Sequence, residues 1–161
     1  MDTAEPGARA ILARFADALA RGDANGAAAC FAPGATYTEP PRFAFSGRAA
    51  IAAFFADFTA RHHAVSFTIA RVLAGPLPPS PPPLHGEGGA GAGNDADRSA
   101  YDSPPRAGEG PGEWVVAVEW RFAYTRTSDG ERTIFEGMCW LDLAADGLIA
   151  RWHGFSARVA E

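Results

Sequence analysis

Two Asp-Gly pairs divide the C-terminal part of the chain into three long segments of alternating apolar and polar residues. These segments are residues 114–126, 132–143 and 148–159, and the pairs are Asp129-Gly130 and Asp146-Gly147. Asp-Gly between two alternating segments is a strong signal for a β-hairpin, because glycine accepts the positive φ that a tight turn needs. The sequence therefore predicts three consecutive antiparallel strands, and this feature limits the possible folds more than any other.

The two turns also predict the register of the strands. If each Asp-Gly pair forms a two-residue turn, Trp120 lies opposite Cys139, and Leu141 lies opposite Trp152. Alternation then gives the sheet one apolar face, with a charged face behind it. The apolar face holds Val116, Val118, Trp120, Phe122, Tyr124, Phe135, Cys139, Leu141 and Trp152. The other face holds Glu119, Arg121, Glu136, Asp142, Arg151 and His153, with Met138, Trp140 and Phe155 among them. A β-bulge in either strand would invert part of this pattern.

Helical spacing dominates the N-terminal part. Apolar residues recur on one stripe over residues 8–21, and Gly22 is expected to end this helix. Asp23 is placed to cap a second, short helix that extends to Phe31. Residues 35–39 are expected to be extended, residues 42–46 to form a loop, and residues 47–61 to form a third helix. A strand is predicted over residues 65–73, where Val65, Phe67 and Ile69 alternate with polar residues.

The composition changes between residues 75 and 112. This segment holds 9 of the 18 glycines and 9 of the 13 prolines, and Tyr101 is its one aromatic residue. Such a segment buries too little apolar surface to offset the entropy of ordering it. It also contains an imperfect repeat, SPPPLHGEG at 80–88 and SPPRAGEG at 103–110. We interpret it as a disordered insertion at a hairpin tip of one domain spanning 1–161; a proline-rich recognition arm is the functional alternative.

Composition excludes several classes of function. All 14 basic residues are arginine, which removes Schiff-base catalysis and lysine-dependent phosphate loops. A net charge of −5 does not indicate a nucleic-acid partner. The N-terminus lacks a secretion signal, and no apolar run reaches the about 20 residues of a membrane span. Cys30 and Cys139 are interpreted as reduced thiols of a soluble cytoplasmic protein. We expect neither a cofactor nor a metal.

Three short motifs resemble one known superfamily. They are ARGDANGAAACFAPGATYTEP at 20–40, GRAAI at 47–51 and DGLIARW at 146–152. They are similar to the opening, the third helix and the final hairpin of SnoaL-like proteins and ketosteroid isomerases of the nuclear transport factor 2 superfamily. The resemblance covers everything except 75–112. It implies an α+β fold in which three N-terminal helices pack on a curved, mostly antiparallel sheet, forming a cone with one pocket.

The resemblance also carries expectations about catalysis. Ketosteroid isomerases use an acidic base and two oxyanion donors, a tyrosine and a protonated aspartate. Their base position matches Glu39, but the donor positions match Phe15 and Cys139. Isomerase activity of that type is therefore not expected. Limonene-epoxide hydrolases place an aspartate just after the final tryptophan, whereas Trp152 is followed by His153 and Gly154.

These observations predict an aromatic pocket with one carboxylate. Its expected residues are Glu39 as a possible catalytic base, with Phe15, Tyr37, Phe55, Phe58, Trp120, Cys139, Leu141 and Trp152 around a ligand. Burial should raise the pKa of Glu39. The alternative is a carboxylate at the rim of the pocket that is bonded to a nearby arginine or to a backbone amide. A small lipophilic or aromatic molecule is the expected ligand. Proton transfer at a carbon acid is the expected reaction if there is one, and a non-enzymatic binding or dimerisation module or a decayed relative are the alternatives.

The charged outer face of the predicted sheet suggests contact with a second copy of the chain. In this superfamily such a face commonly packs against a second subunit, which implies a homodimer. His153 is expected to point outward toward this face, and Asp142 and Arg151 to form a cross-strand pair. Cys139 is expected to be an inert buried thiol, and His62-His63 are not expected to bind metal.

Overall fold

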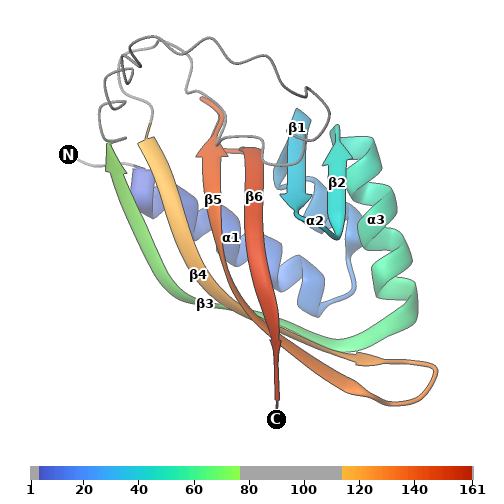
Figure 1. Cartoon of the computed structure of the whole chain (residues 1–161). Coiled ribbons are helices and arrows are strands. Elements are labelled where there is room, and N and C mark those ends of the chain that lie inside the picture. The colour runs from blue at the N-terminus through green and yellow to red at the C-terminus, as the bar shows by residue number, and fades with distance from the viewer. Residues whose placement is uncertain (1–3, 77–113, 161) are drawn as a thin grey trace, which may run out of the picture. The chain divides into compact units, whose positions relative to one another are not determined.

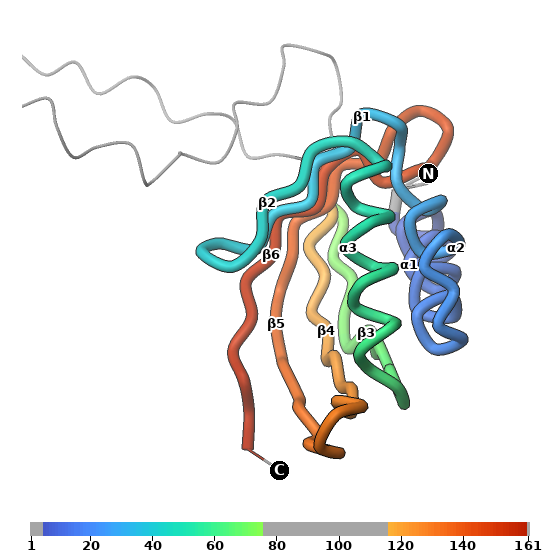
Figure 2. Tube along the Cα trace, turned by 90° about the vertical axis from the view of Figure 1, so that its right-hand side faces the viewer, coloured from blue at the N-terminus to red at the C-terminus, as the bar shows by residue number. Residues whose placement is uncertain are grey.

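The computed structural model describes residues 4–76 and 114–160. The predicted insertion, 75–112, lies almost wholly outside these residues, so its interpretation stays a prediction. The elements are α1 (Ala4–Ala20), α2 (Ala24–Ala28), β1 (Phe31–Glu39), β2 (Phe43–Ser46), α3 (Arg48–Arg61), β3 (His62–Pro76), β4 (Trp114–Arg126), β5 (Arg132–Leu143) and β6 (Ile149–Val159). The strands form one sheet in the order β2-β1-β6-β5-β4-β3, and the helices cover one of its faces (Figure 1; Figure 2).

The α+β class and the curled, mostly antiparallel sheet are as predicted, but the three helices do not precede all the strands. The strands β1 and β2 lie between α2 and α3, and β1 runs parallel to β6. Phe31, expected at the end of a helix, begins β1 instead. Its ring is fully buried against Phe15 and Phe55, and this packing outweighs the weak local preference for helix.

The segment 42–46, expected to be a loop, contains the strand β2. It pairs with β1 in antiparallel register, with Tyr37 opposite Phe45 and Glu39 opposite Phe43. Phe43 and Phe45 place their rings against each other and against Phe54 of α3. The two prolines of the connecting turn suggested a loop, whereas the two aromatic residues after them decide the structure.

The first hairpin has a longer turn than predicted, which corrects its register by two positions. Val118 lies opposite Cys139, and Trp120 lies opposite Gly137. The turn is closed by the amide of Arg126, which donates to the carbonyl of Glu131 at 2.9 Å, and Gly130 adopts φ 73°. Four residues therefore form the loop instead of two. A shift of two keeps every side chain on its predicted face, because the period of a strand is two.

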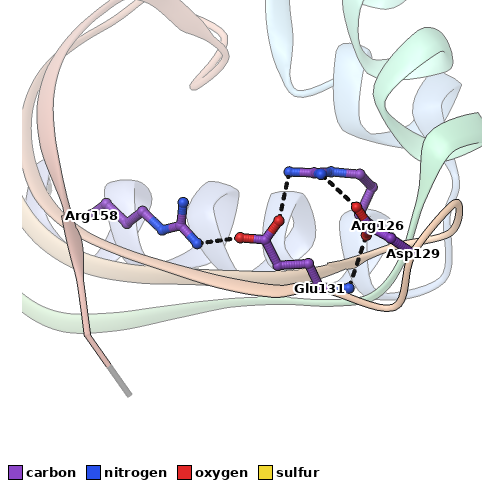
Figure 3. A network of polar contacts seen from close by, with 4 residues as sticks. All are labelled: Arg126, Asp129, Glu131 and Arg158. Atoms are coloured by element: carbon purple, nitrogen blue, oxygen red, sulfur yellow. Dashed lines mark hydrogen bonds and ion pairs between the residues drawn. The ribbon is translucent and has the colours of Figure 1, made fainter.

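Charged side chains surround this turn. Arg126 pairs with both Asp129 and Glu131, and Arg158 of β6 pairs with the other oxygen of Glu131 (Figure 3). The amide of Glu131 donates to the Asp129 carboxylate at 3.0 Å. All four side chains are largely exposed, so these pairs contribute little to the free energy of unfolding. Their effect is to fix the shape of the longer loop.

The second hairpin has the predicted register. Cys139 lies opposite Gly154, and Leu141 lies opposite Trp152. The turn itself is one residue longer than predicted, since the amide of Ala144 donates to the carbonyl of Leu148. A register shift at Asp142 and Leu143 compensates for the extra residue. The β-bulge thus restores the expected alignment over the rest of the strands.

The two faces of the sheet differ as predicted. The inner face, under the helices, buries Val116, Val118, Trp120, Cys139, Leu141 and Trp152. The outer face leaves Met138 46 %, Trp140 41 % and Phe155 46 % exposed. No helix among residues 4–76 and 114–160 is long and apolar enough to cross a membrane.

Candidate functional site

A cavity of about 100 Å³ lies between the inner face of the sheet and the helices α1 and α3. Its lining is almost wholly aromatic, and the polar atoms come from few residues. The lining residues are Phe15, Leu19, Tyr37, Glu39, Arg42, Phe43, Phe54, Phe55, Phe58, Phe67, Trp120, Phe122, Tyr124, Phe135, Trp152 and Ser156. A single water needs about 10–15 Å³ of such space, and an engineered apolar cavity of about 150 Å³ holds benzene. The cavity therefore suits a very small molecule, or a single ring if aromatic side chains move.

Glu39 is the carboxylate of this cavity. It ends β1, and its side chain is only 8 % exposed. Tyr37, two residues earlier and on the same face of the strand, donates its hydroxyl to Oε1 at 3.3 Å. On the other oxygen, Oε2, Arg42 donates from Nη2 at 3.1 Å and Ser156 donates from Oγ at 3.5 Å. Arg42 also bonds Ser156, so the three side chains form one connected group.

Burial determines the electrostatics of Glu39. Desolvation raises the pKa of this carboxyl above its ordinary value, although Arg42, Tyr37 and Ser156 oppose the change by stabilising the anion. The direction of the shift is the predicted one. Both sequence-based interpretations thus describe part of the site, because the carboxyl has a raised pKa and is also paired with an arginine. The pKa of Tyr37 is raised well above its ordinary value by burial and by the neighbouring Glu39.

Arg42 lies at the partly exposed edge of the cavity. Its side chain is 36 % exposed, and its guanidinium carbon lies 4.8 Å from the centre of the Phe135 ring and 5.7 Å from that of Phe43. A guanidinium at such distances is attracted by the ring electrons. The same side chain therefore neutralises Glu39 and contacts two aromatic walls of the cavity.

Two indole N–H groups in the cavity wall have no hydrogen-bond partner. They are Nε1 of Trp120 and Nε1 of Trp152, and the two residues are 4 % and 1 % exposed. On the side of Trp120 Nε1 the neighbouring polar group is the Cys139 thiol, a weak acceptor. A buried donor without an acceptor costs about 1–3 kcal/mol, and buried tryptophans usually find a partner. Among the described residues, these two nitrogens are the buried side-chain N and O atoms without a hydrogen-bond partner.

Two glycines allow the indoles to lie flat on the sheet. A methyl group on Gly137 would lie 2.6 Å from Cζ2 of Trp120 and 2.4 Å from the backbone oxygen of Phe155. A methyl group on Gly154 would lie 2.9 Å from Nε1 of Trp152 and 3.3 Å from Cγ of Glu39. A side chain at either position would therefore collide with an indole that lines the cavity.

Seven of the nine predicted site residues line the cavity, and two do not. The seven are Phe15, Tyr37, Glu39, Phe55, Phe58, Trp120 and Trp152. Cys139 and Leu141 are fully buried on the same face but lie outside the lining. The observed register places Cys139 opposite Gly154, as predicted. Burial raises the pKa of this thiol far above its ordinary range, which suits packing and not nucleophilic attack.

Sequence reasoning missed Arg42 and Ser156. Arg42 follows two prolines in a segment expected to be a loop, and Ser156 is an unremarkable residue of the last strand. Glu39 and Ser156 lie on strands that pair through the parallel contact of β1 with β6, which no hairpin signal predicts. The spacing Glu-x-x-Arg at 39–42 was the one available signal for the ion pair.

A second, more open hollow lies at the ends of β5 and β6. It is lined by Glu131, Arg132, Arg158, Val159 and Ala160, so the expectation of a single pocket is not confirmed. Within the described ranges, no cluster of three or more His, Cys, Asp or Glu side chains is arranged to hold a metal ion.

Many solved structures share this fold. An LEH-like epoxide hydrolase of M. tuberculosis is 16% identical, with a TM-score of 0.60 over 95% of this chain and 84% of the other. SalBIII, an epoxide hydrolase/cyclase-like enzyme of pyran ring formation in salinomycin, is 18% identical, with a TM-score of 0.59 over 92% and 89%. A ketosteroid isomerase-like protein of Erwinia carotovora atroseptica is 13% identical, with a TM-score of 0.59 over 100% of both chains. The fold is that of the nuclear transport factor 2-like superfamily.

The family match agrees with the fold. Residues 12–76 match the model of the SnoaL-like domain, and this match confirms the resemblance inferred from the motifs. No curated protein matches the sequence. At these identities the solved structures establish the fold alone.

Proposed function

We propose that this SnoaL-like domain binds a small lipophilic or aromatic molecule in its aromatic cavity. One observation carries the proposal: an ionisable carboxyl, Glu39, is buried in the wall of a cavity whose other surfaces are almost all aromatic rings. Such a combination of apolar walls and a few converging polar groups is typical of small-molecule sites. The neighbours named as isomerase-like, cyclase-like and hydrolase-like proteins are compatible with a ligand of this kind.

We further propose that Glu39 acts as a base at a carbon acid. Its carboxylate would take a proton from a carbon next to a carbonyl, the C–H electron pair would form the enolate, and the proton on Glu39 would then return to carbon. A raised pKa makes the carboxylate a better base, and Arg42 opposes the rise by stabilising the anion. No cofactor enters this reaction.

The test uses cyclohexanone as the probe, with exchange of its α-protons for deuterium measured by NMR in D₂O. We expect the protein to accelerate the exchange, and Glu39→Gln to reduce the acceleration at least about 100-fold, the contribution expected of a general base. Glu119→Gln, an exposed carboxylate of β4, serves as the matched control and should leave the rate unchanged.

Binding of cyclohexanone without any acceleration by the wild-type protein would overturn the role of Glu39 as a base. It would favour the alternative of a carrier without chemistry. Absence of binding to cyclohexanone and to other small ring compounds of this size would overturn the cavity as a ligand site.

We also propose that the outer face of the sheet associates with a second copy of the chain. The face leaves Met138, Trp140 and Phe155 exposed, with His153 stacked beside Trp140. Its charges are already paired across strands, Asp142 with Arg151 at 3.3 Å and Arg121 with Glu136 at 3.9 Å. A face that is apolar at its centre and carries balanced charge suits a self-complementary contact.

Sedimentation velocity tests the dimer. We expect wild-type protein to sediment as a dimer and Trp140→Glu to sediment as a monomer, because the substitution places a charge in the centre of the contact. Ala13→Glu, on the exposed side of α1, is the control that adds the same charge elsewhere. A monomeric wild type, or a dimer that survives both Trp140→Glu and Phe155→Glu, would contradict the proposal.

A further inference from the structure

We propose that the molecule in the cavity carries a carboxylate, which binds the guanidinium of Arg42 at the mouth of the cavity while its apolar ring lies inside. The inference names the chemical class of the ligand. It rests on the proposed binding of a small ring compound and is independent of Glu39 acting as a base. Its starting point is the position of Arg42, the arginine among the residues that line the cavity.

Arg42 marks the mouth of the cavity. Every other lining residue is buried or half-buried, whereas the Arg42 side chain is 36 % exposed. Its guanidinium carbon lies 4.8 Å from the centre of the Phe135 ring and 5.7 Å from that of Phe43, and both rings belong to the cavity wall. The positive charge is therefore held between the aromatic walls and water. A ligand whose ring fills the apolar interior meets this cation with the group that it leaves in the mouth.

The guanidinium has more donors than the protein uses. Arginine carries five N–H donors and no acceptor. Here Nη2 donates to Oε2 of Glu39 at 3.1 Å and to Oγ of Ser156. Among the described residues, no acceptor is hydrogen-bonded to Nε or Nη1 of Arg42. The N–H groups of these two nitrogens are thus available to a ligand at the mouth.

A carboxylate suits this position better than other head groups. It offers two acceptor oxygens, and its hydrogen bonds to a guanidinium are about twice as strong as those between neutral groups. A cationic group would be repelled by Arg42, and a neutral amide would gain less. Because the mouth is partly exposed, the carboxylate keeps part of its hydration and avoids the high cost of burying an ion.

Glu39 lets the site accept the additional negative charge. Its Oε2 lies 3.1 Å from Nη2 of Arg42, so a ligand carboxylate on the same guanidinium brings two anions close together, which favours protonation of one of them. The titratable groups around Glu39 are Arg42 in the turn, Tyr37 on β1 and Cys139 on β5. Burial raises the pKa of Tyr37, Cys139 and Glu39, so the first two stay protonated and Glu39 takes up one proton from solution.

The test compares cyclohexanecarboxylate with cyclohexanecarboxamide, which has nearly the same shape and no charge. In calorimetric titration at pH 6, wild-type protein should bind the carboxylate at least about tenfold more tightly, because hydrogen bonds between charged groups are the stronger ones. From pH 6 to pH 8 the affinity for the carboxylate should fall, by up to about tenfold per pH unit, because one proton is bound with each anion. The affinity for the amide should depend much less on pH.

Variants assign the preference to Arg42. Arg42→Gln should lower carboxylate affinity at least about tenfold and leave amide affinity within about threefold, whereas Arg42→Lys, which keeps the charge, should retain part of the preference. Glu39→Gln has no proton to take up and should bind the carboxylate with little dependence on pH. Arg71→Gln, which removes an exposed arginine paired with Glu119, is the matched control and should change neither affinity. If the Arg42 variants fail to fold, the two probes and the pH dependence on wild-type protein still decide the question.

The outcomes separate this inference from the function on which it rests. Equal affinity for both probes, or tighter binding of the amide, would overturn the carboxylate and leave the cavity as a ligand site. A carboxylate affinity that Arg42→Gln does not lower, or that stays constant from pH 6 to pH 8, would overturn it too, because the anion would then lie away from Arg42 and Glu39. If cyclohexanone binds and neither of these probes does, the inference fails and the proposed function stands. If none of the three compounds binds, the proposed function itself is overturned.

Discussion

Burial raises the pKa of Glu39, and its hydrogen-bond partners lower it. The net shift should make the free energy of unfolding depend on pH. Its pKa is raised in the folded state, so over the pH range between the ordinary value, about 4.3, and the folded value the native state binds more protons than the unfolded state. The free energy of unfolding must therefore fall as the pH rises through that range, and it levels off once Glu39 is ionised in both states.

The first prediction compares Glu39→Gln with wild type in thermal unfolding from pH 4 to pH 8. Glutamine has nearly the same shape and no proton to lose. The Tm of the variant minus the Tm of wild type should increase with pH above about 4.3 and then become constant. A difference that stays constant from pH 4, or that decreases, would show that the carboxyl is not held at a raised pKa.

Gly154 leads to a second prediction at the residue scale. Alanine at this position would place a methyl group 2.9 Å from the buried nitrogen of Trp152, closer than side chains approach in folded proteins. We expect Gly154→Ala to lower the free energy of unfolding by about 1–3 kcal/mol, the usual cost of overpacking a core, and to abolish binding of cyclohexanone. Gly34→Ala, where nothing lies within 4 Å, is the control. Equal free energies of unfolding for the two variants would contradict the close packing of Trp152 against Gly154.

The apolar residues of the site could be predicted where they follow the periodicity of one helix or strand. Phe15 and Phe55 follow from helical spacing, and Trp120 and Trp152 follow from the alternation of strands. Arg42 and Ser156 did not, because their contact joins a turn after two prolines to the far end of the last strand. Local sequence patterns do not encode such long-range pairs, so the ion pair on Glu39 required the structure.

At the scale of elements, the hairpin signals predicted which faces the side chains occupy better than they predicted the turns. Both Asp-Gly turns are longer than two residues, yet the faces are correct. In one hairpin the shift is even, and in the other a bulge compensates for it. The strand β2 was missed because Pro40-Pro41 indicated a turn and the four residues after it were too few to show alternation.

Two glycines, one inside the helix α1 and one just after it, have different backbone roles. Gly22 has φ 68°, and its amide donates to the carbonyl of Leu19 while the amide of Asp23 donates to that of Ala18, the arrangement that ends many helices. Gly7 lies inside α1 with open space around its Cα.

The two positions should respond in opposite directions to alanine. Gly22→Ala should lower the free energy of unfolding by about 1–2 kcal/mol, because a side chain disfavours the left-handed conformation. Gly7→Ala should raise it by about 0.5–1 kcal/mol, because alanine favours the helix. Urea unfolding of both variants measures the two changes, and equal changes of the same sign would contradict the assigned end of α1.

At the scale of the whole molecule, the curl of the sheet and the helices on one face create an enclosed aromatic space. The alternation of the long strands makes one face apolar, and α1 and α3 then cover it, so the fold class follows from the sequence (Figure 2). The cavity itself depends on how individual side chains pack, for example Trp120 against Gly137 and Trp152 against Gly154. No sequence pattern predicts the volume that such packing leaves.

The central claim is that a small ring compound occupies this space beside Glu39. A crystal structure of the protein soaked with cyclohexanone tests it most directly. We predict electron density for the ring among Phe15, Phe55 and Phe67, beside the carboxyl of Glu39. Side chains that close the cavity in the crystal, or a ring bound only elsewhere on the molecule, would contradict it.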